Sequence, residues 1–422
     1  MQNLEILNSS DFYILEDNDN FIFYNPVRHY ACRLTPLDLS IFNLIFKHRD
    51  INIILSNIPM QYHKYITDIY ELVEKYKILN TDNIATDNVK YNIPDTYYLH
   101  LTYSCNLDCT YCYNKSVRKH TKELSLTQWK SIINNIIPFA NRIVLTGGEP
   151  FIYKNLPEIV LYIRKSKPNI RLEIISNCMI NFKTYEKANV VFDNINSVSF
   201  SCDNISGINQ PRTNFNVNVF YENIAYVKAN FTKLNIVISS VYSKGSKNEQ
   251  RSINSFCKCN NIEFRSVLIV PPSSDDISLL PPLDEYTDSL KKVYHKLPNY
   301  RKHCGAGVGV LSIAPNGNLY PCQSLMYPQY LIGNLCEMTI ENLVKTEILN
   351  TIRNVFCVEN IPKCKQCKLR YLCAGGCRAA AINLYNSPSA FPANLCAYYR
   401  EKYRNALSSI PQMSNLNILS KQ

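Results

Sequence analysis

The cysteines are the residues of this sequence best suited to chemistry. The 422 residues include 17 cysteines, and ten of them fall into two closely spaced groups. In the first group, three residues separate Cys105 from Cys109 and two separate Cys109 from Cys112. Zinc sites favour paired Cys-x2-Cys hooks, and ferredoxins use other spacings. Three thiolates could hold a four-iron cluster with one iron open to a further ligand; the alternative is a structural cluster completed by a distant fourth ligand.

The second group contains seven cysteines near the C-terminus. It follows the order Cys-x12-Gly-x4-Cys, then Cys-x2-Cys-x5-Cys-x3-Cys, then a last cysteine: Cys304, Cys322, Cys364, Cys367, Cys373, Cys377 and Cys396. Two such hooks would also suit zinc, but seven cysteines do not divide into two complete zinc tetrads. The remaining cysteines show no such pattern and are expected to be free buried thiols: Cys32, Cys178, Cys202, Cys257, Cys259, Cys336 and Cys357.

Polar motifs follow several strand-like runs. In Thr146-Gly147-Gly148-Glu149-Pro150, the glycines would let the backbone approach a ligand closely, and the carboxylate could meet an ammonium group. Ser176-Asn177 ends the next run, and Ser201-Cys202-Asp203-Asn204 ends the one after it, with Arg212 shortly beyond. Taken alone, Gly-Gly-Glu-Pro could be a simple turn, and Arg212 could be a solvated loop arginine.

Strand-like and helix-like segments alternate from about residue 95 to residue 285. Ser125 and Gln128 form a capping box for one helix, and Asn155 with Glu158 caps the next. Repeated strand–helix units predict an α/β fold with a parallel sheet, in the form of an open barrel. The proline-rich residues 271–282 are expected to be a linker. The predicted strands are Tyr98–Tyr103, Ile143–Thr146, Leu172–Ile175, Val198–Ser201, Ile236–Val241 and Ile262–Leu268.

Residues 1–90 have a different pattern. Two strand-like runs, Phe12–Leu15 and Phe21–Tyr24, flank a polar turn. Thr35, Pro36 and Asp38 supply an N-cap, a first-turn proline and an acidic residue for a helix. A hairpin followed by helices in a segment of this size predicts a winged-helix-like domain. One face of its second helix would carry Ile66, Ile69, Leu72, Val73 and Tyr76.

The first cysteine group follows the first strand of a β/α series, and Tyr111 precedes its third cysteine. This arrangement resembles the radical S-adenosylmethionine (SAM) superfamily. The resemblance implies a partial (β/α)6 TIM-like barrel with a 4Fe–4S cluster at the carboxyl ends of its strands. The open iron would bind SAM, and reductive cleavage would release a 5′-deoxyadenosyl radical. Gly147-Gly148-Glu149 resembles the motif that binds the SAM amino group. The implied SAM-binding residues are Tyr111, Gly147, Gly148, Glu149, Pro150, Ser176, Asn177 and Arg212.

The second cysteine group resembles the SPASM extension of radical SAM enzymes, with all seven cysteine positions present. The resemblance implies two auxiliary 4Fe–4S clusters, and so three clusters in all. Carried over by position, Cys304, Cys322 and Cys377 would hold the first auxiliary cluster. The second would have a full set of thiolates from Cys364, Cys367, Cys373 and Cys396. Some relatives have a further cysteine shortly after the one matching Cys304, and this chain has none there, which leaves an open iron or an unidentified ligand.

Composition and charge limit the partners. With 46% hydrophobic and 19% charged residues, the chain is globular. Its longest apolar runs are too short to span a bilayer, and the first residues predict no signal peptide, so we expect a cytoplasmic protein without membrane contact. A net charge of +11 suggests an anionic partner. Because Pro36–Phe46 contains no Lys or Arg, nucleic-acid binding is not expected.

The N-terminal hairpin and helix resemble the precursor-peptide recognition element of peptide maturases, which binds a leader peptide as an added strand. The resemblance implies a maturase of a ribosomally made precursor peptide, with reduced flavodoxin or ferredoxin as electron donor. A thioether cross-link is the favoured product, and a carbon–carbon link or epimerisation is an alternative. One rival is a sulfatase-maturase-like enzyme, although such relatives have Asp where this chain has Gln323; another is a zinc-bearing regulator without catalysis. The expected domains are 1–90, 95–285 and 300–400, with a tail at 401–422.

Overall fold

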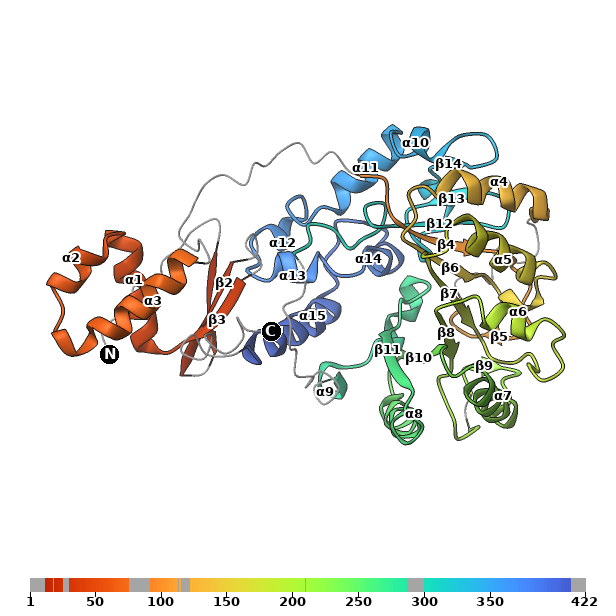
Figure 1. Cartoon of the computed structure of the whole chain (residues 1–422), viewed down its shortest axis with the longest axis horizontal. Helices are drawn as coiled ribbons and strands as arrows, with labels where there is room; N and C mark the ends of the chain where they lie inside the picture. Colours follow the sequence, from red (N-terminus) through yellow and green to blue (C-terminus); the bar gives the residue numbers. More distant parts are fainter. Residues whose placement is uncertain are drawn as a thin grey trace.

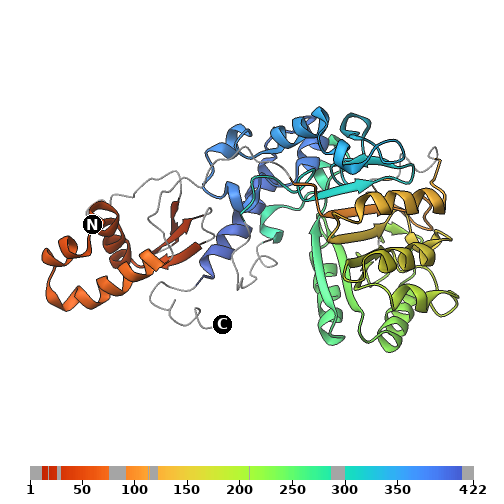
Figure 2. The same cartoon turned by 45° about the horizontal axis from the view of Figure 1, so that its top comes forward.

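The computed structural model describes residues 12–17, 19–25, 30–75, 92–112, 114, 122–208, 210–286 and 300–410. Of the predicted positions, Tyr76 and residues 411–422 lie outside these residues. An N-terminal domain lies at one end of an elongated molecule and the barrel at the other, with the cysteine-rich C-terminal region between them (Figures 1 and 2). None of the helices in the described ranges is long and apolar enough to cross a membrane.

The N-terminal domain is a three-stranded antiparallel sheet followed by three helices. Strands β1 (Tyr13–Asp17), β2 (Asn20–Asn25) and β3 (Tyr30–Leu34) pair in sequence order. Helices α1 (Pro36–His48), α2 (Ile51–Ser56) and α3 (His63–Lys75) follow, with the 3-10 turn η1 (Met60–Tyr62) before α3. The predicted N-cap Thr35 is confirmed, and the structure adds a capping box, because the side chains of Thr35 and Asp38 each accept a hydrogen bond from the other's backbone N–H. Strand β3 and helix α2 were not predicted.

The barrel consists of six parallel strands in the spatial order β11-β10-β8-β7-β6-β4. This confirms the expected α/β partial barrel. The strands are β4 (Thr96–His100), β6 (Arg142–Thr146), β7 (Arg171–Ser176), β8 (Ser197–Ser201), β10 (Asn235–Tyr242) and β11 (Glu263–Leu268). The connecting helices are α4 (Leu126–Ile136), α5 (Leu156–Ser166), α6 (Ala188–Phe192), α7 (Val217–Asn230) and α8 (Lys247–Cys259). The capping box of Ser125 and Gln128 at α4 is confirmed; Asn155 is the N-cap residue of α5, but its side chain makes no capping hydrogen bond.

The main hydrophobic core lies between the barrel strands and these helices. The apolar face of α4, with Trp129, Ile132 and Ile133, is fully buried there, as are outward strand residues such as Ile143 and Leu172. Side chains alternate between the two faces of a strand, so the neighbouring positions face the barrel interior. Several of those positions are polar, and they line a cavity in place of a second apolar core: Tyr98, Arg142, Glu173, Ser199, Ser239 and Arg265.

The C-terminal region begins by extending the barrel sheet. Strand β12 (Val310–Ile313) pairs parallel to β4, and β13 (Asn318–Tyr320) and β14 (Gly333–Asn334) continue the sheet in antiparallel pairing. The predicted linker includes the 3-10 helix η3 (Ser274–Leu279), and α9 (Leu283–Tyr286) follows it. Helix α15 (Ala393–Ser408) includes residues 401–408, so this part of the expected tail is helical. The other helices are α10 (Ile340–Leu343), α11 (Glu347–Phe356), α12 (Pro362–Lys365), α13 (Arg370–Cys373) and α14 (Arg378–Tyr385), with η4 (Pro328–Tyr330) before them.

The N-terminal sheet is buried on both faces. One face packs on its own helices through residues such as Phe23 and Cys32. The other packs on the cysteine-rich region, where Ile22, Tyr24 and Ala31 form an apolar cluster with Leu369, Leu372, Tyr403 and Leu407. The Lys368 ammonium group adds a hydrogen bond of 3.1 Å to the Ile14 carbonyl oxygen. The N-terminal domain is therefore docked beside the second cysteine group.

Candidate functional site

The first cysteine group lies on the loop after β4, at the carboxyl end of the barrel. Within this loop, β5 (Asp108–Cys109) pairs with β9 (Arg212–Thr213), so that Cys109 lies opposite Arg212. Cys105, Cys109 and Cys112 all line one cavity of about 470 Å³ that continues into the barrel. Burial raises the pKa of Cys109 to about 11; Arg212 acts against this rise, while Cys112 and Cys105 add to it. The three thiols therefore face a common space beside a buried cation.

Gly147 and Gly148 form part of the same cavity and hold the cysteine loop close to β6. The Gly148 N–H donates to the Thr102 carbonyl oxygen at 2.7 Å, and the Glu149 N–H donates to that of Ser104 at 2.9 Å. A Cβ atom on Gly147 would lie 2.2 Å from the Thr102 oxygen, and one on Gly148 would lie 2.2 Å from the Ser104 oxygen. Gly147 also has a φ of +144°, which disfavours other residues. Only glycine permits this close approach of the two strand ends.

The Glu149 carboxylate is directed away from the cavity, which differs from the expected contact with an ammonium group. The side chain is fully buried, and its oxygens accept hydrogen bonds from the backbone N–H groups of Phe151 and Asn177 and from the Ser176 hydroxyl, at 2.7–3.1 Å. The reason is local: Glu149 is the N-cap of the 3-10 helix η2 (Pro150–Ile152), which turns its side chain inward. Burial raises its pKa to about 7, against the effect of these hydrogen bonds. Pro150 is likewise buried.

Ser176 is the last residue of β7, and both Ser176 and Asn177 line the cavity. Asn177 connects β7 with the cysteine loop, because its side-chain NH2 donates to the Asn106 side-chain oxygen at 2.7 Å and lies 3.6 Å from the Cys105 sulfur. Through Glu149, the same two residues are bound to the end of β6. Three strand ends are thus held in one arrangement around the cavity.

Arg212 is buried beside the cysteines and is not a solvated loop arginine. Its Nε donates to the Asp203 carboxylate at 2.8 Å, and its guanidinium lies 5.7 Å from the centre of the Tyr111 ring. The Tyr111 hydroxyl also donates to Asp203, which further accepts from the Val241 N–H at 2.7 Å. Burial alone would lower the pKa of Arg212, but Asp203 and Tyr111 raise it, so the group stays cationic. Asp203 therefore positions two of the predicted SAM-binding residues.

Several cavity residues inside the barrel were not predicted. Glu173 on β7 is buried and forms ion pairs with Arg142, at 2.6 Å, and with Arg171. Arg265 of β11 lines the same cavity, as does Gln323 of the C-terminal region. Strand alternation, read together with the parallel register, is the sequence signal that would have placed Arg142, Glu173 and Arg265 on the inner face.

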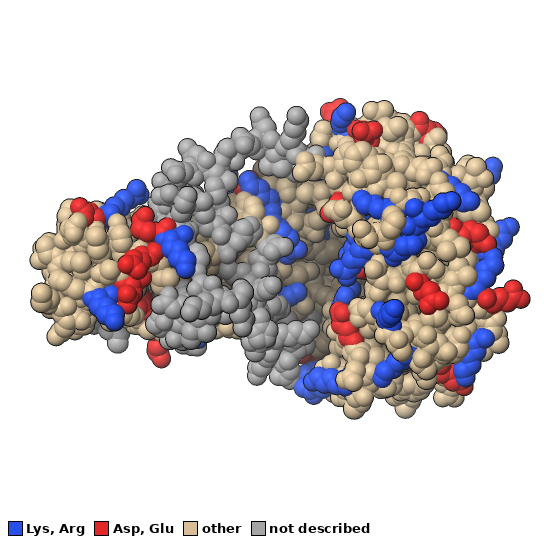
Figure 3. Space-filling model, in the orientation of Figure 1, with Lys and Arg blue, Asp and Glu red and all other residues tan. Residues whose placement is uncertain are grey.

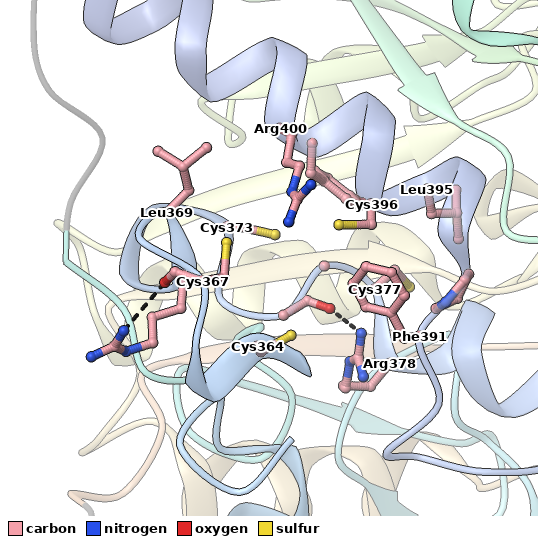
Figure 4. Close-up of a pocket in the computed structure, with 15 residues that line it drawn as sticks. Cys364, Cys367, Leu369, Cys373, Cys377, Arg378, Phe391, Leu395, Cys396 and Arg400 are labelled. Carbon is pink, nitrogen blue, oxygen red and sulfur yellow. Dashed lines mark hydrogen bonds between the residues drawn. The ribbon is translucent and has the colours of Figure 1, made fainter. Parts of the chain in front are cut away.

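Five of the seven C-terminal cysteines line a small cavity between α12, α13 and α15 (Figure 4). Four of them, Cys364, Cys367, Cys373 and Cys396, are the set expected for the second auxiliary cluster, and the fifth is Cys377. Burial raises the pKa of Cys373 to about 12, and the neighbouring thiols of Cys364, Cys396 and Cys367 raise it further. Arg378 and Arg400 also line this cavity.

The set expected for the first auxiliary cluster, Cys304, Cys322 and Cys377, lies on a second cavity of about 380 Å³, which Cys373 also lines. Burial raises the pKa of Cys322 above its usual range, as do Cys304 and Cys377. Tyr98 and Gln323 line both this cavity and the barrel cavity, so the two spaces share a wall. Tyr399 lines this cavity and that of the other four cysteines. The three cysteine groups therefore form a series from the barrel toward the N-terminal domain.

The thiol groups fit clusters better than single ions. In the part of the chain that the structure describes, no three His, Cys, Asp or Glu side chains are arranged to hold one metal ion. A zinc tetrad needs such convergence, whereas a four-iron cluster spreads its ligands around a cube. All 17 cysteines lie in described residues, and none forms a disulfide. Of the unpatterned cysteines, Cys259 and Cys336 are exposed, so the expectation of burial was wrong for these two, which lie at the end of α8 and after β14.

Comparisons with known proteins agree with this arrangement. Residues 99–250 match the radical SAM superfamily, and residues 304–368 match the iron–sulfur cluster-binding SPASM domain. The chain is 20% identical over 369 residues to the antilisterial bacteriocin subtilosin biosynthesis protein AlbA of Bacillus subtilis (strain 168), covering 82% of this chain and 81% of AlbA.

Two solved structures have a similar fold at low sequence identity. Streptococcus suis SuiB bound to precursor peptide SuiA has a TM-score of 0.58 at 18% identity, covering 92% of this chain and 99% of SuiB. Native anSMEcpe with bound AdoMet has a TM-score of 0.61 at 17% identity, covering 78% and 100%. The domain matches overturn the rival of a zinc-bearing regulator. The chain is therefore a radical SAM enzyme with a C-terminal SPASM domain.

Proposed function

We propose that this enzyme oxidises a ribosomally made precursor peptide and installs a cross-link in it. The observation that carries the proposal is the shared wall of Tyr98 and Gln323 between the barrel cavity and the cavity of Cys304, Cys322 and Cys377. A peptide residue in the barrel would lie beside both the first cysteine group and the first auxiliary group. One residue of the peptide could then lose a hydrogen atom beside the first cysteine group and an electron to the first auxiliary group without leaving the site.

The cofactors proposed are SAM and three 4Fe–4S clusters. Cys105, Cys109 and Cys112 would hold the SAM-binding cluster, Cys304, Cys322 and Cys377 the first auxiliary cluster, and Cys364, Cys367, Cys373 and Cys396 the second. When bound, the SAM cluster and SAM supply a 5′-deoxyadenosyl radical that abstracts hydrogen.

This chain's own residues would position SAM. Gly147 and Gly148 line the cavity and would place the backbone at the end of β6 against its methionine part. Arg212 would bind the SAM carboxylate, since it keeps its charge beside Asp203 and Tyr111. Ser176 and Asn177 line the same space and would add hydrogen bonds. Glu149 would act by holding Ser176 and Asn177 in place.

The proposal of a peptide substrate rests on the relatives and on the N-terminal domain. AlbA is named for the biosynthesis of a bacteriocin, and SuiB has been solved with a precursor peptide. In the present chain, β1 and β3 are the edges of the N-terminal sheet, so either could pair with a leader strand. A reduced flavodoxin or ferredoxin would supply electrons.

A thioether is the favoured product, because the first auxiliary group has three cysteines and could accept a substrate thiolate as a fourth ligand. Joining a C–H carbon to a thiol sulfur removes two hydrogen atoms in all. The 5′-deoxyadenosyl radical would take the one on carbon, and the thiol hydrogen would leave as a proton and one electron, which an auxiliary cluster could accept. A carbon–carbon link and epimerisation remain alternatives, as does Cys or Ser oxidation of the sulfatase-maturase kind. Gln323 is a poor base for that last reaction.

The test is anaerobic reconstitution, reduction with dithionite and SAM, and mass spectrometry of a candidate precursor peptide. We expect 5′-deoxyadenosine together with a peptide that has lost two hydrogens per modification, and fragmentation would locate the bond. The variant Cys105→Ala should form neither. Formation of 5′-deoxyadenosine without a change in peptide mass would favour epimerisation, which a deuterated solvent would reveal. If neither product forms in protein with all its iron and sulfide, the proposal is wrong.

A further inference from the structure

The segment around the second auxiliary site has an unusual charge composition. Residues 360–400 contain no Asp or Glu, although the whole chain has 34 of them. The same segment contains six basic residues: Lys363, Lys365, Lys368, Arg370, Arg378 and Arg400. All 41 positions lie in the described part of the chain. This concentration of positive charge surrounds the cavity of Cys364, Cys367, Cys373 and Cys396.

Two of these cations are directed at the thiols themselves. Arg378 and Arg400 lie on either side of the cysteines (Figure 4). Arg378 is buried and donates hydrogen bonds to the carbonyl oxygens of Pro388 and Ala390, at 3.0 and 3.2 Å. Arg378 therefore lies within the site, whereas Arg400 lines the cavity and is also exposed.

Two others contribute to the docking of the N-terminal domain. Lys368 donates to the Ile14 carbonyl oxygen at 3.1 Å. The Arg370 guanidinium lies 5.2 Å from the centre of the Tyr13 ring and 4.6 Å from that of Tyr371. Their charge therefore lies at an interface within the chain.

Lys363 and Lys365 remain, and neither role explains them. Both are exposed on α12, and Cys364 lies between them in the sequence, with its thiol directed inward to the cavity. The Lys363 ammonium nitrogen lies 4.8 Å from the centre of the Phe391 ring, and Phe391 lines the cavity. Cys367 and Cys396 are themselves only partly buried. The site thus lies just beneath a positively charged surface.

We propose that this surface, formed by Lys363 and Lys365 of α12 together with the exposed Arg400 of α15, docks an acidic one-electron carrier protein. The inference rests on the proposed function, since it assigns a partner to the second auxiliary site. Opposite charges accelerate encounter between proteins and orient them. Cys364, within the same short helix, brings the cluster close to the docked carrier. The reduced carrier loses one electron and the cluster gains it, and no bond forms or breaks.

The test compares a charge-reversed variant with a matched control in the full, reconstituted protein. Lys363→Glu/Lys365→Glu changes the docking surface. Lys165→Glu/Lys233→Glu makes the same change in net charge at exposed positions of α5 and of the turn after α7, on the barrel. An acidic flavodoxin, reduced in advance, is mixed anaerobically with each protein, and the loss of visible cluster absorbance gives the second-order rate constant. Iron and sulfide content are matched first.

We expect the docking-surface variant to be reduced by flavodoxin about 10-fold more slowly at low salt, with a smaller difference at high salt. Its reduction by dithionite should be unchanged, and Lys363→Arg/Lys365→Arg should restore the flavodoxin rate. Equal rates for the docking-surface variant and the wild type, or equal slowing in the barrel control, would overturn the proposal. So would loss of precursor-peptide affinity with an unchanged flavodoxin rate, because the surface would then bind the leader. Dithionite-driven 5′-deoxyadenosine formation tests the proposed function separately.

Discussion

Gly148→Ala tests whether the close packing of two strand ends determines the site. The substitution adds one methyl group at a position where the backbone of β6 approaches the loop that leads to Cys105. Its Cβ would lie 2.2 Å from the Ser104 oxygen and 2.6 Å from the Tyr103 oxygen. Both neighbours are backbone atoms, so rotation of a side chain cannot relieve the contact.

The size of the effect follows from these distances. Real Cβ atoms essentially never approach another heavy atom closer than 3.0 Å, so the loop must move by roughly 1 Å, which is the shortfall from 2.2 Å. Such a movement would weaken the hydrogen bonds from Gly148 to Thr102 and from Glu149 to Ser104. It would also carry Cys105 away from Asn177. Because a misplacement of about 1 Å can lower a rate about 100-fold, we expect a loss of that order in 5′-deoxyadenosine formation.

The assay combines turnover with two structural measurements on anaerobically reconstituted protein. Iron content and the change in the electron paramagnetic resonance spectrum on adding SAM would report cluster assembly and SAM binding. The control is Gly309→Ala, where an added Cβ has no heavy atom within 4 Å; it should keep wild-type values. If Gly148→Ala retains the SAM-dependent spectrum and a rate within a few fold of wild type, the close approach does not determine the site.

Three further predictions address other contacts. Asp203→Asn removes the charge that holds Arg212 and Tyr111, and it should weaken SAM binding about 10-fold in calorimetry without changing peptide affinity; an unchanged dissociation constant would contradict it. Burial raises the pKa of Glu149 to about 7, so the native state binds a proton at this carboxylate more readily than the unfolded chain does. Thermal stability should therefore fall as pH rises from 4.5 to 7. Glu149→Gln should remove that part of the pH dependence, and a parallel curve would refute the assignment. Leu372→Ala should weaken docking of the N-terminal sheet by about 2–4 kcal/mol, seen as faster hydrogen exchange in β2 with the barrel unchanged.

Local signals in the sequence were sufficient for many elements and for the cysteine groups. The N-cap at Thr35 and the capping box at Ser125 depend on residues at most three apart, so they could be predicted without knowledge of the fold. Strand β3 was missed because Tyr30–Leu34 is short, and Arg33 interrupts its apolar pattern. The spacing of the cysteines indicated two groups, and the resemblance to the SPASM extension divided the second group into two cluster sites.

The directions of side chains could not be predicted in the same way. Glu149 follows two glycines, which suggested a ligand contact, but its position as N-cap of η2 turns the carboxylate into the protein. The burial of Arg212 results from the pairing of β9 with β5, which joins residues more than 100 positions apart. The polar interior of the barrel also depends on strand register, so the alternation of side chains within one strand could not by itself bring Glu173 and Arg142 together.

The docking of the N-terminal sheet did have a signal in the sequence. A strand with one solvated face alternates apolar and polar residues, whereas Phe21-Ile22-Phe23-Tyr24 is a continuous apolar run, typical of a strand buried on both faces. One face of this sheet is covered by α1 and α3, and so the other needed a partner elsewhere in the chain. The structure identifies it as Leu369 and Leu372, which lie between Cys367 and Cys373. The segment that carries thiols of the second auxiliary site is therefore also the surface on which the N-terminal domain packs. It follows that residues beside this site orient the edge strands, β1 and β3, that we propose bind a leader peptide.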